Sequence, residues 1–189
     1  AIQINDTHPA MAVAELMRIL MDEYNLGWDE AWHITTHTTS YTNHTIMAEA
    51  LEKWSEWLFK EQLPRVYSIV LEIDRRLKEQ LYRLYPNDHG KINYMAPIAD
   101  GEVKMANLCL ACCHKVNGVS KLHTVILKNS IFSDYYKLDN SRFINVTNGI
   151  AYRRWLCQAN PRLSDFISSL IGDSFKSDCT NLEKLLEFK

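Results

Sequence analysis

The stretch of residues 2–9, Ile-Gln-Ile-Asn-Asp-Thr-His-Pro, decides the fold class. Ile2 and Ile4 alternate as in a buried strand, and Pro9 favours the first turn of a helix because its fixed φ suits that position. Between them stand an amide, a carboxylate, a hydroxyl and an imidazole. A strand that leads into a helix predicts a helix-rich α/β fold, in which such a polar turn either caps the helix or contacts a ligand.

Composition limits the class of protein. The 189 residues are 47% hydrophobic, which is enough for a packed core. The net charge of −2, from 21 basic and 23 acidic residues, argues against a nucleic-acid partner. No apolar run is long enough to span a membrane, and five cysteines in an ordinary composition favour a reducing compartment. We therefore expect a cytoplasmic protein without nucleic-acid or membrane partners.

Hydrophobic spacing predicts further helices. Apolar residues three and four apart indicate helices over residues 9–24, from 28 to about 34 with a cap at or near Asp29, over 64–85, over 105–114, over 119–127 and from 153 onward. The helix over 64–85 also carries a charged face, which is typical of exposure to solvent. Its members are Arg65, Glu72, Asp74, Arg75, Arg76, Lys78 and Glu79.

The strand signals are shorter. The threonine-rich run over 35–45 favours an extended segment because β-branched side chains weaken helices, and a short helix is expected near 48–54. Residues 98–103, around Asp100-Gly101, favour a hairpin. Residues 143–146 favour a third short strand, whereas Gly118 is expected to end the helix over 105–114.

Three of these strand ends carry polar clusters, at residues 5–8, 42–44 and 147–149. The carboxyl ends of strands in an open α/β sheet meet at one crevice, where ligands bind. The clusters hold donors and acceptors without a nucleophile–base pair or a lysine, which suits a polyhydroxylated ligand such as a sugar. The same residue types also serve as helix caps and turns, so both interpretations stay open. The candidates are Asp6, His8, Asn43, His44 and Asn148.

Two patterns suggest a metal or a thiol site and are rejected. His33 and His37 stand one helical turn apart, as in a zinc-binding helix, but the glutamate of that pattern is missing. Cys109, Cys112 and Cys113 have no partner pair at zinc-site spacing and belong to an apolar helix, where free cysteine packs as a small hydrophobe. We expect no metal site and no cysteine nucleophile.

The sequence resembles the α-glucan phosphorylase family, which comprises glycogen, starch and maltodextrin phosphorylases. The order and spacing of the matching segments agree over nearly the whole chain. The segments are IQINDTHP at 2–9, ELMRIL at 15–20, WD at 28–29, AW at 31–32, YTNHT at 41–45, EALEKW at 49–54, LPR at 63–65, MANLC at 105–109, VNGV at 116–119, TNGI at 147–150 and RRWL at 153–156.

The resemblance implies a glycosyltransferase B architecture, with catalysis in the cleft between two Rossmann-like domains. It implies phosphorolysis of terminal α-1,4-linked glucose by inorganic phosphate, with retention, to α-D-glucose 1-phosphate. It further implies a homodimer that carries pyridoxal 5'-phosphate, whose phosphate relays a proton.

Carried over residue by residue, the resemblance implies that His44 and Asn148 hold the glucose 6-hydroxyl. The main-chain carbonyl of His44 would also face the positive charge that develops on the sugar, so His44 is the candidate catalytic residue. Asp6 and His8 would line the pocket beside the glucose.

The chain departs from the family pattern at Ala151-Tyr152, where Thr-Pro is usual, and at Cys112-Cys113, where Gly-Ser is usual. The family's cofactor lysine, phosphate-binding arginine and lysine, and Gly-rich loop lie further along and have no match here. We expect an internal fragment, inactive alone and without cofactor-binding residues. Residues 1–148 would be the later part of the N-terminal sugar-facing domain, and 149–189 the interdomain crossover and first helices of the C-terminal domain.

A different class of function also fits the pattern. A helical carbohydrate-binding or scaffold module, without catalysis, would use the long helix over 64–85 to face a polymer or a partner.

Overall fold

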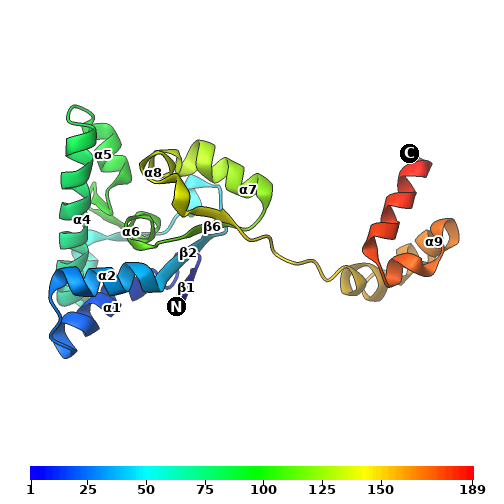
Figure 1. The fold of residues 1–189 in the computed structure, drawn as a ribbon, viewed down its shortest axis with the longest axis horizontal. Coiled ribbons are helices and arrows are strands. Elements are labelled where there is room, and N and C mark those ends of the chain that lie inside the picture. Colours follow the sequence, from blue (N-terminus) through cyan, green and yellow to red (C-terminus); the bar gives the residue numbers. More distant parts are fainter. The chain divides into compact units, whose positions relative to one another are not determined.

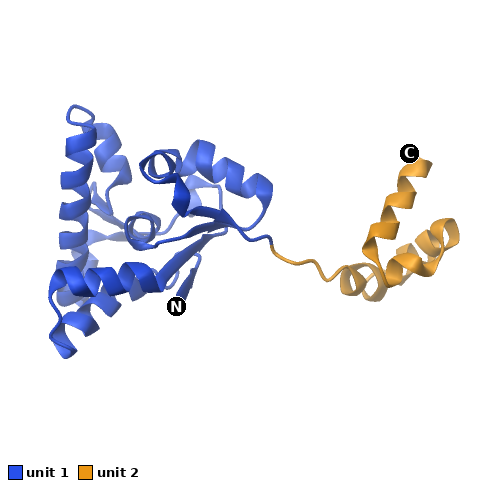
Figure 2. Cartoon of the chain, viewed as in Figure 1, with its two compact units in different colours: residues 1–147 blue, residues 148–189 orange.

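The computed structural model describes all of residues 1–189 and divides them into two compact units, residues 1–147 and 148–189 (Figures 1 and 2). The first unit contains every strand of the chain, and the second unit is helical. None of the helices combines the length and the apolar character that a membrane crossing requires.

The first unit is built on a four-stranded parallel sheet in the order β1-β2-β6-β7. These strands are β1 (Ile2–Asn5), β2 (Thr39–Asn43), β6 (Val116–Gly118) and β7 (Phe143–Asn145). The register places Asn5 opposite Thr42, and Thr42 opposite Asn117. Because all four strands run the same way, the polar residues that follow them lie at one edge of the sheet. The predicted α/β class and the strands at 2–5 and 143–146 are confirmed.

Helices cover this sheet and connect its strands (Figure 1). They are α1 (Ala12–Arg18), a π-helical turn (Ile19–Glu23), α2 (Trp28–Thr38), α3 (Glu56–Gln62), α4 (Pro64–Leu84), α5 (His89–Met95), α6 (Met105–Cys112), α7 (Lys121–Ile126), a second π-helical turn (Leu127–Ile131) and α8 (Ser133–Leu138).

A second, antiparallel sheet in the order β3-β5-β4 contains β3 (Lys53–Ser55), β4 (Ile98–Ala99) and β5 (Glu102–Lys104). The predicted hairpin is therefore confirmed, and its turn has positive φ at Asp100 and Gly101, as a type I′ turn requires.

The second unit contains a π-helical segment (Arg153–Gln158), α9 (Pro161–Ile171) and two 3₁₀ segments (Asp173–Lys176 and Cys179–Phe188). The helical tail predicted from residue 153 is thus confirmed. Pro161 opens α9 after Asn160, whose side chain accepts a hydrogen bond from the Leu163 N–H, and Gly172 ends it with φ 76°.

The core of the first unit lies where α1, α4 and α6 pack together and α6 packs on β2. Ile4, Tyr41 and Met17 are fully buried there. Helix α6 is apolar on almost every side, and six of its eight residues are buried, which explains its lack of an amphipathic pattern.

Four local predictions were wrong. Thr35 to Thr38 continue α2 instead of forming a strand, because Thr35 is fully buried and tertiary packing outweighs propensity. Gly27, not Asp29, occupies the N-cap of α2. Residues 48–54 form only a 3₁₀ turn at Ala48–Ala50, since Lys53–Ser55 pair with β5. Gly118 does not end the helix over 105–114: α6 ends at Cys112, and Gly118 is the last residue of strand β6.

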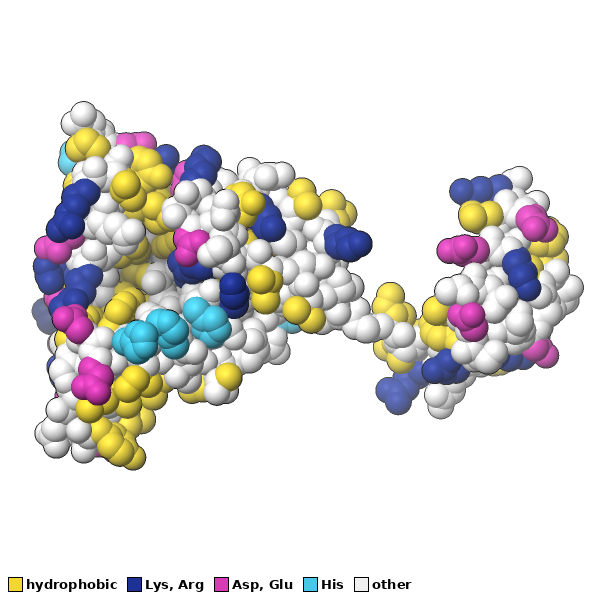
Figure 3. All heavy atoms as spheres, in the orientation of Figure 1, with side chains coloured by type: hydrophobic (Ala, Val, Ile, Leu, Met, Phe, Trp, Pro, Cys, Tyr) yellow, Lys and Arg dark blue, Asp and Glu magenta, His cyan; other side chains and the backbone are white.

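The charged face of α4 is exposed or half-buried, with one exception. Figure 3 shows basic and acidic side chains alternating along this helix, and hydrogen bonds from Arg75 and Arg76 lower the pKa of Glu72 to about 2. Asp74 is the exception: it is 3% exposed, accepts from the Ile98 N–H (2.9 Å) and pairs with Lys78 (2.7 Å). It therefore ties α4 to the hairpin.

Gly118 is required by the close approach of α7 to the end of β6. A Cβ at this position would lie 2.9 Å from Thr124 Cα and 3.0 Å from Thr124 N. Both atoms are backbone, so α7 or β6 would have to move. The first turn of α7 is also held by Ser120, whose side chain accepts from the His123 N–H (3.0 Å).

We expect Gly118→Ala to lower the free energy of unfolding by about 1–3 kcal/mol, the usual cost of overpacking. Urea unfolding followed by circular dichroism measures the change. Gly90→Ala is the matched control, because a Cβ at Gly90 would contact only Asp88 Oδ1, at 3.8 Å. It should be neutral or stabilising by up to about 1 kcal/mol, since alanine favours a helix. Equal losses in the two variants would contradict the close approach at Gly118.

Candidate functional site

The candidate site is built on the carboxyl edge of the parallel sheet. After β1 the chain turns at Asp6, whose φ of 60° is uncommon for a residue other than glycine. The turn is held from the next strand, because the Asp6 N–H donates to the Thr42 carbonyl (2.8 Å). The Asp6 carboxylate accepts from the Thr7 N–H (2.7 Å). Such a backbone conformation persists only where its surroundings fix it.

His44 follows β2 and is exposed. Its Nε2 lies 2.5 Å from Asn5 Oδ1, at the end of the neighbouring strand. With the proton on Nε2, His44 donates to Asn5 and keeps Nδ1 free as an acceptor. The imidazole therefore stands at the edge of the sheet with one ring nitrogen available to a ligand.

Glu52 joins the first turn to the segment before β3. Its Oε2 accepts from Thr7 Oγ1 (2.9 Å), and its Oε1 accepts from Trp54 Nε1 (3.0 Å). His8 Nδ1 lies 3.8 Å from the same Oε2, and the His8 side chain is 81% exposed. His8 is thus open to solvent and free to reorient, whereas Thr7 is buried and fixed.

Side-chain hydrogen bonds join the ends of all four strands. Thr42 Oγ1 accepts from Gln3 Nε2 (2.6 Å) on β1 and from Asn117 Nδ2 (3.4 Å) on β6. Asn117 Oδ1 accepts from the Val146 N–H (2.6 Å), just beyond β7. Asn145 Nδ2 donates in return to the Gly118 carbonyl (2.8 Å). Each short strand is therefore held to its neighbour by side chains as well as by the backbone.

The sequence-based prediction missed Asn117 and His123. His123 is 9% exposed, and its Nε2 lies 3.1 Å from Asn43 Oδ1, at the end of β2. Both residues were overlooked because β6 was not recognised as a strand. The signal was present, since Val116-Asn117-Gly118 is followed by Ser120, a capping residue three positions before His123.

The structure brings Asp6, His8 and His44 to the carboxyl edge, on the turns after β1 and β2. Asn43 is fully buried, so it supports the edge and is not presented to a ligand. Asn148 opens the second unit and is exposed.

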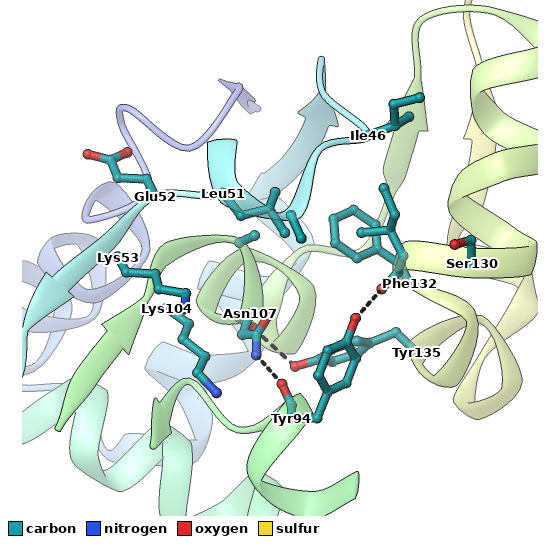
Figure 4. Close-up of a pocket in the computed structure, with 13 residues that line it drawn as sticks. Ile46, Leu51, Glu52, Lys53, Tyr94, Lys104, Asn107, Ser130, Phe132 and Tyr135 are labelled. Carbon is teal, nitrogen blue, oxygen red and sulfur yellow. Dashed lines mark hydrogen bonds between the residues drawn. The ribbon is translucent and has the colours of Figure 1, made fainter. Parts of the chain in front are cut away.

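A separate pocket of about 390 Å³ lies beside this edge (Figure 4). Lys53, Lys104 and Asn107 lie along one side of it, and Phe132 and Tyr135 along the other. None of the four predicted sugar-contacting residues lines it. Its two lysines pair with carboxylates that do not line the pocket: Lys53 lies 3.1 Å from Glu102 and Lys104 lies 3.8 Å from Asp100. Burial lowers the pKa of Lys104.

The residues at the edge do not fit a pyridoxal phosphate. That cofactor requires a lysine amine for its aldehyde and cationic groups for its phosphate. The side chains that hydrogen-bond at the edge are amides, hydroxyls, imidazoles and carboxylates, and none is a lysine or an arginine. No group of three histidine, cysteine, aspartate or glutamate side chains is arranged so that it could hold a metal ion.

The three clustered cysteines are buried, with exposed fractions of 0–3%. The Cys109 thiol donates a hydrogen bond to Cys113, and this bond and burial raise the pKa of Cys109. The same bond lowers the pKa of Cys113 against the effect of burial. Burial raises the pKa of Cys112. A nucleophilic cysteine needs both a thiolate and access to substrate, and none of the three has both.

The family model and the individual relatives that match this chain are all phosphorylases. The family model described as "Carbohydrate phosphorylase" matches residues 1–189. The chain is 53% identical over 185 residues to the glycogen phosphorylase of Bacillus subtilis (strain 168), and 47% identical over 191 residues to the muscle form of glycogen phosphorylase from Homo sapiens. These alignments cover 98% and 100% of the chain but 23% of each relative, so the chain spans about a quarter of their length.

Burial predicts how the cysteines react. In the native chain a thiol reagent at about pH 8, near the ordinary thiol pKa, should modify only exposed Cys179 and half-buried Cys157. All five should react after unfolding. Absorbance titration with a disulfide reagent counts them, and Cys157→Ser with Cys179→Ser is the control that should abolish the native reaction. Rapid labelling of the native double variant would contradict the prediction that Cys109, Cys112 and Cys113 are inaccessible to the reagent.

Proposed function

The chain belongs to the carbohydrate phosphorylase family, and on that premise we propose that it forms the sugar-facing half of the catalytic cleft of an α-glucan phosphorylase. The parent enzyme would use inorganic phosphate to release terminal α-1,4-linked glucose as α-D-glucose 1-phosphate, with retention. The proposal is carried by one observation: the carboxyl edge of the sheet presents hydrogen-bonding groups without a nucleophile–base pair, and Asp6 and His44 are held there by neighbouring residues. Such a set binds a polyhydroxylated ligand and leaves the attacking group to phosphate.

Each candidate residue has a proposed role. His44 and Asn148 hold the glucose 6-hydroxyl, which can donate to Nδ1 of His44 when Nε2 donates to Asn5. Asp6 and His8 line the pocket beside the sugar. The main-chain carbonyl of His44 faces the positive charge that develops on the sugar ring, and a dipole fixed in that direction stabilises the transition state.

The other half of the chemistry belongs to parts of the parent enzyme outside this chain. We propose that those parts bind pyridoxal phosphate, which supplies a phosphate group for proton transfer, and that residues 149–189 cross into the second domain. The parent enzyme would be a homodimer in the cytoplasm, a compartment that suits its free cysteines. Because catalysis needs both halves in register, the 189-residue chain alone would be inactive.

The role of His44 can be tested in the full-length parent enzyme. His44→Ala should reduce kcat/KM by roughly 2–4 kcal/mol, about 30- to 1000-fold, because a preorganised polar contact is lost. The rate of glucan synthesis from glucose 1-phosphate is the measurement. A 6-deoxy analogue separates the contacts, since it should lower the wild-type rate far more than the rate of the variant.

The control for this experiment is His89→Ala, which removes an exposed histidine on α5. His89→Ala should leave the rates with glucose 1-phosphate and with its 6-deoxy analogue unchanged. If the 6-deoxy analogue discriminates equally against the wild type and His44→Ala, His44 does not contact the 6-hydroxyl.

A second test uses the 189-residue chain itself. After incubation with pyridoxal phosphate and dialysis, it should retain no cofactor absorbance, because the edge offers neither the amine nor the cations. Retained absorbance would contradict the proposal that the cofactor is bound by parts of the parent enzyme outside this chain.

Titration of the 189-residue chain with a maltooligosaccharide, followed by calorimetry, tests the alternative function. Tight binding would favour a carbohydrate-binding module.

A further inference from the structure

A buried histidine joins two strand ends behind the candidate site. His123 lies on α7, 9% exposed, and its ring reaches from the end of β6 to the end of β2. It is not among the residues that face the proposed sugar. Its two ring nitrogens nevertheless both make hydrogen bonds, at 3.1 Å to Val119 N and 3.1 Å to Asn43 Oδ1.

The donor and acceptor in each bond are fixed by the backbone. The Val119 N–H can only donate, so His123 Nδ1 is the acceptor and Nε2 carries the proton. The Thr45 N–H donates to Asn43 Oδ1 (3.1 Å), which identifies that atom as the carbonyl oxygen. His123 Nε2–H therefore donates to the same oxygen. The Asn43 amide group in turn donates to the Tyr41 hydroxyl (3.0 Å).

These bonds enclose His44. The bond from the Thr45 N–H to the Asn43 side chain closes a turn in which His44 is the central residue. Asn43 is fully buried, so the orientation of its amide is set by Tyr41 and His123 together. The direction of the main chain at His44 thus depends on a histidine 79 positions further along the sequence.

The position of His123 is itself fixed. The main-chain N–H of His123 donates to Ser120 Oγ (3.0 Å), and Thr124 Oγ1 donates to the Ser120 carbonyl (2.8 Å). The backbone of Thr124 packs directly against Gly118. The bonds to Ser120 thus fix the first turn of α7, and the contact of Thr124 with Gly118 fixes that turn against β6.

We infer that His123 is a positioning residue, which holds the turn at Asn43–Thr45 so that the main-chain carbonyl and the imidazole of His44 point at the substrate. This inference rests on the proposed function. It deepens that function by assigning to the Asn43–His123 bond the orientation of the group that meets the developing charge. Displacing a reacting or stabilising group by about 1 Å can cost on the order of 10²-fold in rate.

Three substitutions in the full-length holoenzyme separate the two bonds. His123→Gln can still donate to Asn43 but loses the acceptor that Nδ1 presents to the Val119 N–H. His123→Asn can still accept from Val119 but does not reach Asn43. His123→Leu removes both bonds while keeping an apolar side chain of similar bulk. His89→Leu, at an exposed position on α5, is the control.

We expect His123→Leu and His123→Asn to lower kcat by about 10²-fold, with KM for the glucan changed less than about threefold. His123→Gln should recover kcat to within about tenfold of the wild type. A merely structural role would predict no such rescue, and thermal melting identifies any variant that fails to fold. Equal kcat for the glutamine and asparagine variants, or a kcat for the leucine variant within threefold of the wild type, would overturn the inference.

Failure of the proposed function can be distinguished from failure of the positioning role of His123. A wild-type parent enzyme that forms no glucose 1-phosphate from glucan and phosphate would refute the phosphorylase proposal. The positioning role is then decided on the 189-residue chain by nuclear magnetic resonance. The ¹⁵N shifts of His123 should report a proton on Nε2, and the Thr45 amide signal should be retained in His123→Gln and displaced in His123→Asn. A proton on Nδ1, or an unmoved Thr45 signal in both variants, would overturn it.

Discussion

Parallel pairing of four short strands is the constraint on which the rest of the first unit depends. Parallel neighbours need crossover connections, so segments rich in helices must separate β1 from β2, β2 from β6 and β6 from β7. The same pairing makes every strand end at one edge, which brings together residues as distant as Asp6, His44 and Asn145. The candidate site is a consequence of strand direction before it is a consequence of side-chain chemistry.

Strands of three to five residues supply few backbone hydrogen bonds, and buried amides supplement them. Asn117 bonds to Thr42 on β2 and to Val146 just beyond β7, and Asn43 bonds to Thr45 and to His123 on α7; both amides are at most 9% exposed. A buried amide without partners is costly, so such a network favours a single arrangement of the edge. The residues that stiffen the edge are therefore different from those that would contact a sugar.

The sequence predicts this fold well where a pattern is long or a turn is chemically distinctive. Helix α4 repeats its apolar residues over 21 positions, and Asp100-Gly101 marks a type I′ hairpin. Strand β6 has only three residues, too few to establish a period, and the threonines of α2 are helical because tertiary burial outweighs their propensity.

For the site, the strand ends at Asp6 and His44 are visible in the sequence, because Asp6 follows alternating isoleucines and His44 follows a threonine-rich run. The buried residues that support these strand ends are not visible in the sequence. His123 and Asn43 lie 80 positions apart and meet only because β2 and β6 pair in parallel. No local pattern encodes that contact, and a histidine on a short helix is indistinguishable in the sequence from one that packs in a core.

The absence of lysine and arginine among the hydrogen-bonding groups of the edge is consistent with the proposed division of the cleft. A sugar that loses its leaving group develops positive charge, and a cation beside it would raise the energy of that transition state. Oriented carbonyl dipoles and carboxylates lower it instead, provided that they are held rigidly. Phosphate requires the opposite environment, because its charge must be met by cations. A cleft with neutral and acidic groups on one side and cations on the other therefore satisfies both reactants, and in the proposed division the edge of this sheet would be the side without cations.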